Sequence, residues 1–187
     1  KFGPKNKWAY FPGVSVRYNV SDEPFMKWTK SFVSVLGLKA SFGITGNAPS
    51  QDYLFYNTYN TSAGNYGFQG QTTPVAKLDG LKLDDLRWEK TSSYNLGFNL
   101  GLFNDMIEID FDYYHKDTKD LLMKDIRIPS MTGYSKLTWA NVGRMTNDGW
   151  EMNINAQNFI KVGKFSMSAG FNVSQNENLV KEMDETV

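Results

Sequence analysis

The amino-acid sequence predicts an all-β fold of about six antiparallel strands. Six segments alternate strictly between apolar and polar residues, which is the period of a strand with two different faces. Aromatic residues make up 15% of the chain and 16 residues are Gly, a composition that favours strands and turns over helix bundles. Short turns and long loops alternate between the segments, and this arrangement is typical of a barrel.

The alternation defines the strands one by one. They cover residues 14–20, 38–45, 95–102, 107–114, 150–157 and 165–174. In the first two, Val, Leu, Phe and Ile oppose Ser, Lys, Thr and Arg; in the third, Leu and Phe oppose Asn and Gly. The fourth is the clearest, because Ile and Phe alternate with carboxylates. In the last two, Trp, Met, Ile, Phe and Val oppose Asn, Gln, Glu and Ser, so every strand has one apolar face.

The connections point to a membrane barrel. Residues 103–106 form a tight hairpin and 160–164 another short turn, whereas 21–31 is a link of middle length. By contrast, 46–86 and 121–141 are long, irregular stretches rich in Tyr, Asn, Gly, Thr and Gln. A soluble sandwich rarely puts its long loops at one end and its short turns at the other, but an outer-membrane barrel does so routinely.

Side-chain chemistry on the two faces supports the same class. The polar face carries mainly Asn, Ser, Gly and Thr rather than the Lys and Glu of a water-exposed sheet. Aromatic residues near the strand ends fit the girdles of a membrane barrel, although aromatics also favour strands in general. The girdle candidates are Tyr10, Phe11, Trp88, Phe103, Tyr113, Trp139, Trp150 and Phe165.

Six strands are too few to close a membrane barrel, because the smallest have about eight. Either the strands belong to a longer polypeptide or several copies assemble. The missing initiator Met favours the first, as does the charged stretch 181–187, which we interpret as the beginning of a further loop. We therefore expect residues 1–187 to be a partial barrel segment with no plug domain.

Composition excludes several functions. The chain has 20 Lys+Arg and 20 Asp+Glu, and zero net charge argues against nucleic-acid binding. One His and no Cys exclude closed zinc sites, thiol catalysis and disulfides, and we expect neither a metal nor a cofactor. No segment is apolar for the roughly 18 residues of a transmembrane helix.

Two features invite a catalytic interpretation. Glu108, Asp110 and Asp112 lie about 7 Å apart on one strand face and could form an acid/base pair or a calcium site. A water-filled lumen accommodates such carboxylates without any catalytic role, and we favour that interpretation. His115 has no Cys, His or Ser partner at catalytic spacing and is expected to be a strand-end residue. The chain is therefore not expected to be an enzyme.

The first long loop carries the candidate substrate-binding residues. Tyrosines alternate there with amides, and a sugar-binding surface stacks aromatic faces on C–H groups while amides bind hydroxyls. The candidates are Tyr53, Tyr56, Tyr59 and Tyr66. The alternative is that these rings pack the loop against its neighbours or a lipoprotein cap. A secreted all-β carbohydrate-binding module is the second functional hypothesis, and it would need a second sheet over its apolar face.

Several segments, taken in order, resemble the barrel of SusC/RagA-type TonB-dependent outer-membrane transporters. They are residues 11–16 with 21–26, 38–47, 88–91 with 95–98, 112–122, and 141–143 with 147–151. This resemblance implies a wall and loop segment of a transporter that imports oligosaccharides or peptides through the outer membrane. It also implies a SusD-like surface lipoprotein partner, contact with outer-membrane lipid, and coupling to TonB through parts of the protein not in this chain.

Overall fold

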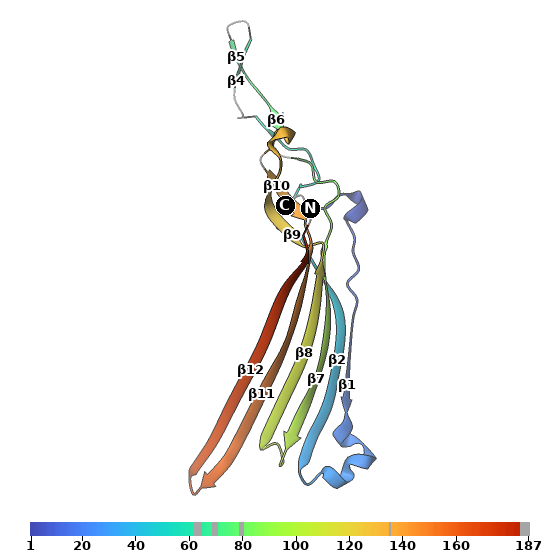
Figure 1. Ribbon diagram of the computed structural model, residues 1–187, viewed down its shortest axis with the longest axis vertical. Coiled ribbons are helices and arrows are strands. Elements are labelled where there is room, and N and C mark those ends of the chain that lie inside the picture. The colour runs from blue at the N-terminus through green and yellow to red at the C-terminus, as the bar shows by residue number, and fades with distance from the viewer. Residues whose placement is uncertain (62–64, 69–70, 79–80, 135, 184–187) are drawn as a thin grey trace.

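The computed structural model describes residues 1–61, 65–68, 71–78, 81–134 and 136–183. Its main feature is a six-stranded antiparallel sheet in which the strands follow one another in chain order (Figure 1). The strands are β1 (Gly13–Asn19), β2 (Val33–Asn47), β7 (Glu89–Leu102), β8 (Ile107–Lys119), β11 (Arg144–Val162) and β12 (Phe165–Glu182). The all-β prediction and the six predicted strands are thus confirmed.

Five of the six strands, all except β1, are longer than the alternation indicated. β2 has 15 residues and β11 has 19, whereas a tilted strand needs only about 9–11 residues to cross a bilayer. In β7, β8 and β12 the extra residues lie at the loop end, whereas β2 gains most of its extra residues at the turn end and β11 is extended at both ends. The stretch 181–187 was expected to begin a loop, but β12 continues to Glu182; residues 184–187 lie outside the described part.

The strand register separates the two faces. Residues that are directly opposite across neighbouring strands share a face of the sheet. One register row on the apolar face comprises Leu38, Phe98, Phe111, Met152 and Val173. The adjacent row on the polar face comprises Arg17, Lys39, Gly97, Asp112, Glu151 and Ser174. Each face keeps its character across all six strands.

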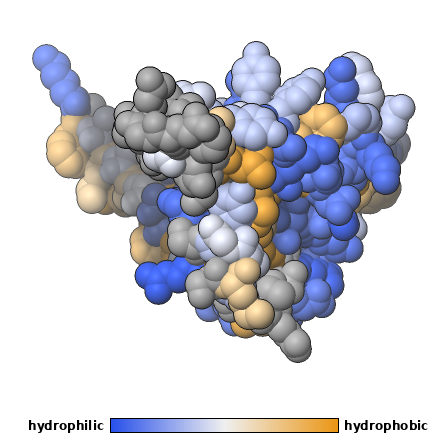
Figure 2. Space-filling model, turned by 90° about the horizontal axis from the view of Figure 1, so that it is seen from above, coloured by the Kyte–Doolittle hydropathy of each residue, from blue (hydrophilic) through white to orange (hydrophobic). Residues whose placement is uncertain are grey.

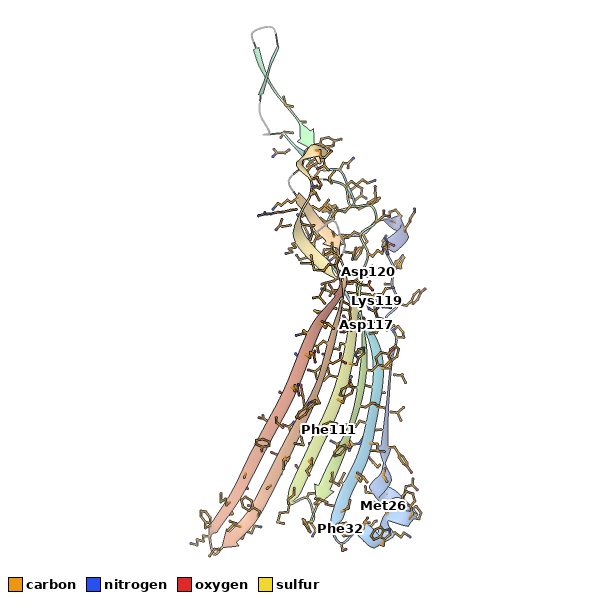
Figure 3. All side chains as sticks on the ribbon, viewed as in Figure 1. Met26, Phe32, Phe111, Asp117, Lys119 and Asp120 are labelled. Atoms are coloured by element: carbon orange, nitrogen blue, oxygen red, sulfur yellow. The ribbon has the colours of Figure 1, made fainter. Side chains whose placement is uncertain are left out.

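Short connections gather at one end of the sheet (Figure 1). The β7–β8 turn has positive φ at Phe103, Asn104 and Asp105, and the β11–β12 turn has φ +60 at Gly163. Between β1 and β2 the chain forms two 3-10 helices, η2 (Val20–Asp22) and η3 (Pro24–Thr29). In Figure 3, Met26 and Phe32 mark this end, and the predicted turns are confirmed there.

The long connections lie at the opposite end and are partly regular, which corrects their prediction as irregular stretches (Figure 1). Small two-stranded hairpins occur in both. They are β3 (Tyr59–Asn60) with β6 (Lys77–Leu78), β4 (Asn65–Phe68) with β5 (Gln71–Pro74), and β9 (Leu122–Arg127) with β10 (Lys136–Asn141). Strands of two to six residues pair through backbone hydrogen bonds and need no apolar alternation, so the period of the sequence misses them. Two more 3-10 helices, η1 (Pro4–Asn6) and η4 (Ser130–Thr132), lie at this end.

Side-chain burial concentrates in the loop end. Among the described residues the buried apolar side chains are Pro49, Leu86, Ile126, Trp139 and Val142, which all lie in the long connections or their hairpins. The sheet itself leaves both faces accessible, as expected of a wall. No helix in the described ranges is long and apolar enough to cross a membrane.

Three of the girdle candidates contact other residues of the loop end, and one of them, Trp139, is buried there, which corrects the prediction for that residue. Trp139 is 8% exposed and lies under the Lys124 ammonium, 4.7 Å from the ring centroid. Phe11 and Trp88 pack edge to face at 5.5 Å, and the Phe11 ring lies against Gly46. Trp150 lies at mid-sheet and stacks on Phe111. The candidates that remain exposed are Tyr10, Phe11, Phe103, Tyr113 and Phe165.

Candidate functional site

The polar face of the sheet holds a shallow hollow of about 570 Å³. Its lining includes three cations and two carboxylates, namely Arg17, Lys39, Lys116, Asp112 and Glu151. In the central row the cations stand on β1 and β2 and the carboxylates on β8 and β11. This wall is polar and charged across its width, as a water-filled lumen permits.

One ion pair crosses the hollow. Lys39 Nζ lies 2.9 Å from Asp112 Oδ2, although β7 separates the two strands. Gly97 occupies the intervening position, and a Cβ there would lie 2.5 Å from the Phe111 carbonyl oxygen and still closer to the Asp112 carboxylate. The missing side chain at Gly97 therefore makes room for the pair.

The three β8 carboxylates that invited a catalytic interpretation have separate surroundings. Asp112 pairs with Lys39, Asp110 accepts a hydrogen bond from the Asn99 amide, and Glu108 stands opposite Gly101. Within the described ranges, no group of three His, Cys, Asp or Glu residues could hold a metal ion. These contacts favour the interpretation of Glu108, Asp110 and Asp112 as polar wall residues.

His115 lies within β8 on the apolar face, not at a strand end as expected. Its Nδ1 is 2.5 Å from Asp148 Oδ1, and the Tyr113 hydroxyl donates to the same oxygen at 3.3 Å. Asp148 is directly opposite His115 in the β8–β11 register. Sequence spacing could not reveal this partner because 33 residues separate the two.

Where the sheet meets the long loops, side chains tie the segments together. The Asn141 amide donates to the carbonyls of Arg87 at 3.0 Å and Asp120 at 2.8 Å, and its oxygen accepts from the Arg87 N–H at 2.8 Å. Arg144 makes two hydrogen bonds to the Asp117 carboxylate, at 2.8 and 2.9 Å. Figure 3 shows Asp117, Lys119 and Asp120 at this junction. Sequence reasoning did not identify these contacts.

Two predicted substrate-binding residues meet in the loop end. Tyr53 and Tyr56 are 70% and 63% exposed, with ring centroids 6.3 Å apart. They line a hollow of about 440 Å³ together with Lys1, Phe2, Pro4, Lys7, Asp52 and Phe55. Seen from above, hydrophilic surface predominates at this end of the molecule (Figure 2).

The other two tyrosines belong to the short strands of the first long connection. Tyr59 belongs to β3, pairs with Leu78 across the hairpin and is 62% exposed. Tyr66 belongs to β4 and pairs with Thr73 through the backbone. Tyr59 does not line the hollow of Tyr53 and Tyr56, and the Tyr66 side chain lies outside the described part of the structure. The structure thus brings Tyr53 and Tyr56 together and separates Tyr59 from them.

A sheet with one apolar face, one charged polar face, short turns at one end and long loops at the other defines the wall of a transmembrane β-barrel. The chain belongs to the family described as TonB dependent receptor-like, beta-barrel, whose model matches residues 1–184. Its members are outer-membrane proteins of the receptor and transporter class. The SusC/RagA resemblance is confirmed.

The relatives agree with this assignment. Over 98% of its length the chain is 36% identical to TonB-dependent receptor P39 of Formosa agariphila, covering 17% of that protein. It is 29% identical to TonB-dependent receptor SusC of Bacteroides thetaiotaomicron, over 98% of the chain and 18% of SusC. The chain thus spans less than a fifth of the length of these curated relatives.

Solved structures of the RagAB peptide importer match as well. In the open-open state the TM-score is 0.84 at 25% identity, over 100% of this chain and 19% of that one. In the closed-closed state the TM-score is 0.81 at 26% identity, over 97% of this chain and 19% of that one. The six-stranded sheet is therefore similar to one stretch of a much larger barrel.

Proposed function

We propose that this chain is the barrel-wall and external-loop segment of an outer-membrane TonB-dependent transporter that imports oligosaccharides or oligopeptides. The observation that carries the proposal is the pairing of an apolar face, which occupies the part of the sheet towards the short turns, with a charged polar face on strands of 13–19 residues from β2 to β12. Such strands suit a wall between lipid and an aqueous interior. Family membership and the likeness to a peptide importer support it.

The sheet edges support a larger barrel. β1 and β12 each pair with only one neighbour in the described sheet. Unpaired strand edges in lipid leave backbone groups unsatisfied at several kcal/mol each, so a membrane barrel must close. In our proposal further strands of the same receptor close it, residues 1–187 include no plug domain, and other parts of the receptor contact TonB.

The loop end is the proposed substrate side. Exposed Tyr53, Tyr56 and Tyr59 and the backbone of Tyr66 all lie in the long connection between β2 and β7. Exposed aromatic rings beside amides suit stacking on sugars or on peptide side chains. A SusD-like surface lipoprotein is the proposed partner at this end, where it would hold substrate over the barrel. The apolar face does not suit a secreted carbohydrate-binding module, because nothing in the described sheet covers it.

Uptake by whole cells tests the proposal. Cells with the intact receptor, cells lacking its gene and cells lacking TonB are given labelled oligosaccharides and oligopeptides of increasing length. We expect uptake of one class to require both the receptor and TonB. Equal uptake of every compound by the three strains would contradict the proposed transport function.

A further inference from the structure

Residues 53–56 form a tight turn that is fixed by contacts on one side. The Tyr56 N–H donates to the Tyr53 carbonyl at 2.9 Å, and the Leu83 N–H donates to the Leu54 carbonyl at 3.3 Å. The Phe55 ring lies against the backbone of Gly3, where an added Cβ would be 2.9 Å from the ring. Lys82 Nζ covers Phe55 at 4.8 Å from the centroid. The turn is thus fixed on one side while its two tyrosines face outward.

Tyr53 holds an uncommon backbone conformation. Its φ is +61, in the left-handed region that favours glycine, and a residue with a Cβ is destabilised there by about 1–2 kcal/mol. Its side chain is nevertheless 70% exposed, so little packing offsets this strain. Strain of this kind concentrates at binding sites.

Positive charge surrounds the two rings. The hollow that Tyr53 and Tyr56 line also contains Lys1 and Lys7 and a single carboxylate, Asp52. None of these three side chains forms an ion pair with another described residue. The hollow therefore combines exposed aromatic faces with an excess of positive charge.

We propose that this hollow binds an anionic oligosaccharide, a sugar chain bearing carboxylate or sulfate groups. The inference rests on the proposed transport function and specifies the substrate class of its loop site. Tyr53 and Tyr56 stack on the C–H faces of the sugar rings, as aromatic side chains do. The ammonium groups of Lys7 and Lys1 pair with the anionic substituents. An acidic peptide fits the charge but makes less use of two adjacent exposed rings.

Calorimetric titration of the intact purified receptor with matched probes tests the proposal. One pair is tetragalacturonate and its methyl ester, and the other is sulfated cellotetraose and cellotetraose; tetraglutamate is the peptide comparison. We expect at least one anionic sugar to bind about tenfold more tightly than its neutral partner, and added salt to remove that difference. Tetraglutamate should bind more weakly than that sugar.

Substitutions then separate charge from stacking. Lys7→Gln should weaken binding of the anionic sugar about fivefold and leave binding of its neutral partner unchanged. Lys5 lies outside the hollow, so Lys5→Gln should not change the affinity for either sugar. Tyr53→Gly removes the ring at a position where the backbone suits glycine, so the turn should fold normally. Tyr53→Gly should weaken binding of both members of the sugar pair about tenfold, whereas Tyr10→Ala should leave both affinities unchanged.

Failure of this proposal can be told from failure of the transport function. If neither anionic sugar binds more tightly than its neutral partner, or if Lys7→Gln has no effect, the anionic specificity is wrong. If tetraglutamate binds as tightly as the sugars and Tyr53→Gly does not weaken them, the saccharide assignment is wrong. TonB-dependent uptake of neutral oligosaccharides or of peptides by whole cells would leave the transport function standing in both cases.

Discussion

Lys39 on β2 and Asp112 on β8 form a 2.9 Å ion pair across the strand that separates them. Glycine at position 97 lies beneath the pair and is the only residue type without a Cβ to obstruct it. The two charged side chains are 31% and 45% exposed, so solvent screens much of their attraction. The close packing at Gly97 should consequently contribute more to the stability of the wall than the ion pair does.

Replacing Gly97 by Ala should destabilise the barrel. The new Cβ would lie 2.5 Å from the Phe111 carbonyl oxygen, and the clash should lower the free energy of unfolding by about 1–3 kcal/mol. Urea unfolding of the intact receptor in detergent measures the change. Gly43→Ala is the matched control, because the nearest atom to its Cβ is 4.0 Å away. Equal unfolding midpoints for the two variants would show that Gly97 has no special steric role.

Neighbouring residues of β7 should face different solvents. Asn95 is on the polar face and Leu96 on the apolar face, and the chain has no Cys of its own. A nitroxide attached to Leu96→Cys in the membrane-embedded receptor should collide mainly with oxygen, which concentrates in lipid. At Asn95→Cys it should collide more with a water-soluble nickel chelate. Similar collision rates at the two sites would contradict the assignment of the faces.

Asn141 should hold the loops onto the end of the sheet. Asn141→Ala removes three hydrogen bonds, to Arg87 and Asp120, and leaves backbone groups unsatisfied at about 1–3 kcal/mol. The stretch around Arg87 should open more often, and trypsin should cleave there several times faster. Asn57→Ala, at an exposed loop position, provides the control. Unchanged cleavage at Arg87 would mean that other contacts hold this junction.

The β11–β12 turn should require a residue that tolerates positive φ. Gly163 has φ +60, so Gly163→Val should destabilise the hairpin by about 1–2 kcal/mol, and Gly163→Asn should restore most of the loss. Refolding yield into detergent, read from the gel mobility of unheated samples, measures both. If Val and Asn give the same yield, the turn does not limit folding.

Much of the fold could be predicted from residues within single strands. Alternation in 107–114, with Ile107, Ile109 and Phe111 against the three carboxylates, predicted both the strand and its two faces. The turn at Phe103–Asp105 followed from residue types that tolerate positive φ. The short hairpins of the long loops could not be predicted, because strands of two to six residues are too short to establish a clear apolar period.

The candidate site was predicted in part. The Tyr-rich loop was identified from composition, and Tyr53 and Tyr56 do lie together. Nothing in the sequence indicated that Lys7, 46 positions before Tyr53, would line the same hollow. Nor did the sequence indicate that Tyr59 lies apart from Tyr53 and Tyr56, because composition carries no information about the path of the backbone in a loop.

By itself, the sequence determined the all-β class and the two faces of each strand, because these depend on residue type and on a period of two. It also indicated the family, because the family's motifs are short local segments that occur in order along the chain. Only the tertiary structure decided which residues of different strands meet. Lys39 contacts Asp112, which lies 73 positions away in the sequence, and His115 contacts Asp148, which lies 33 positions away. Such partners follow from the cross-strand register, which hydrogen bonding and turn geometry fix between strands and no single strand encodes.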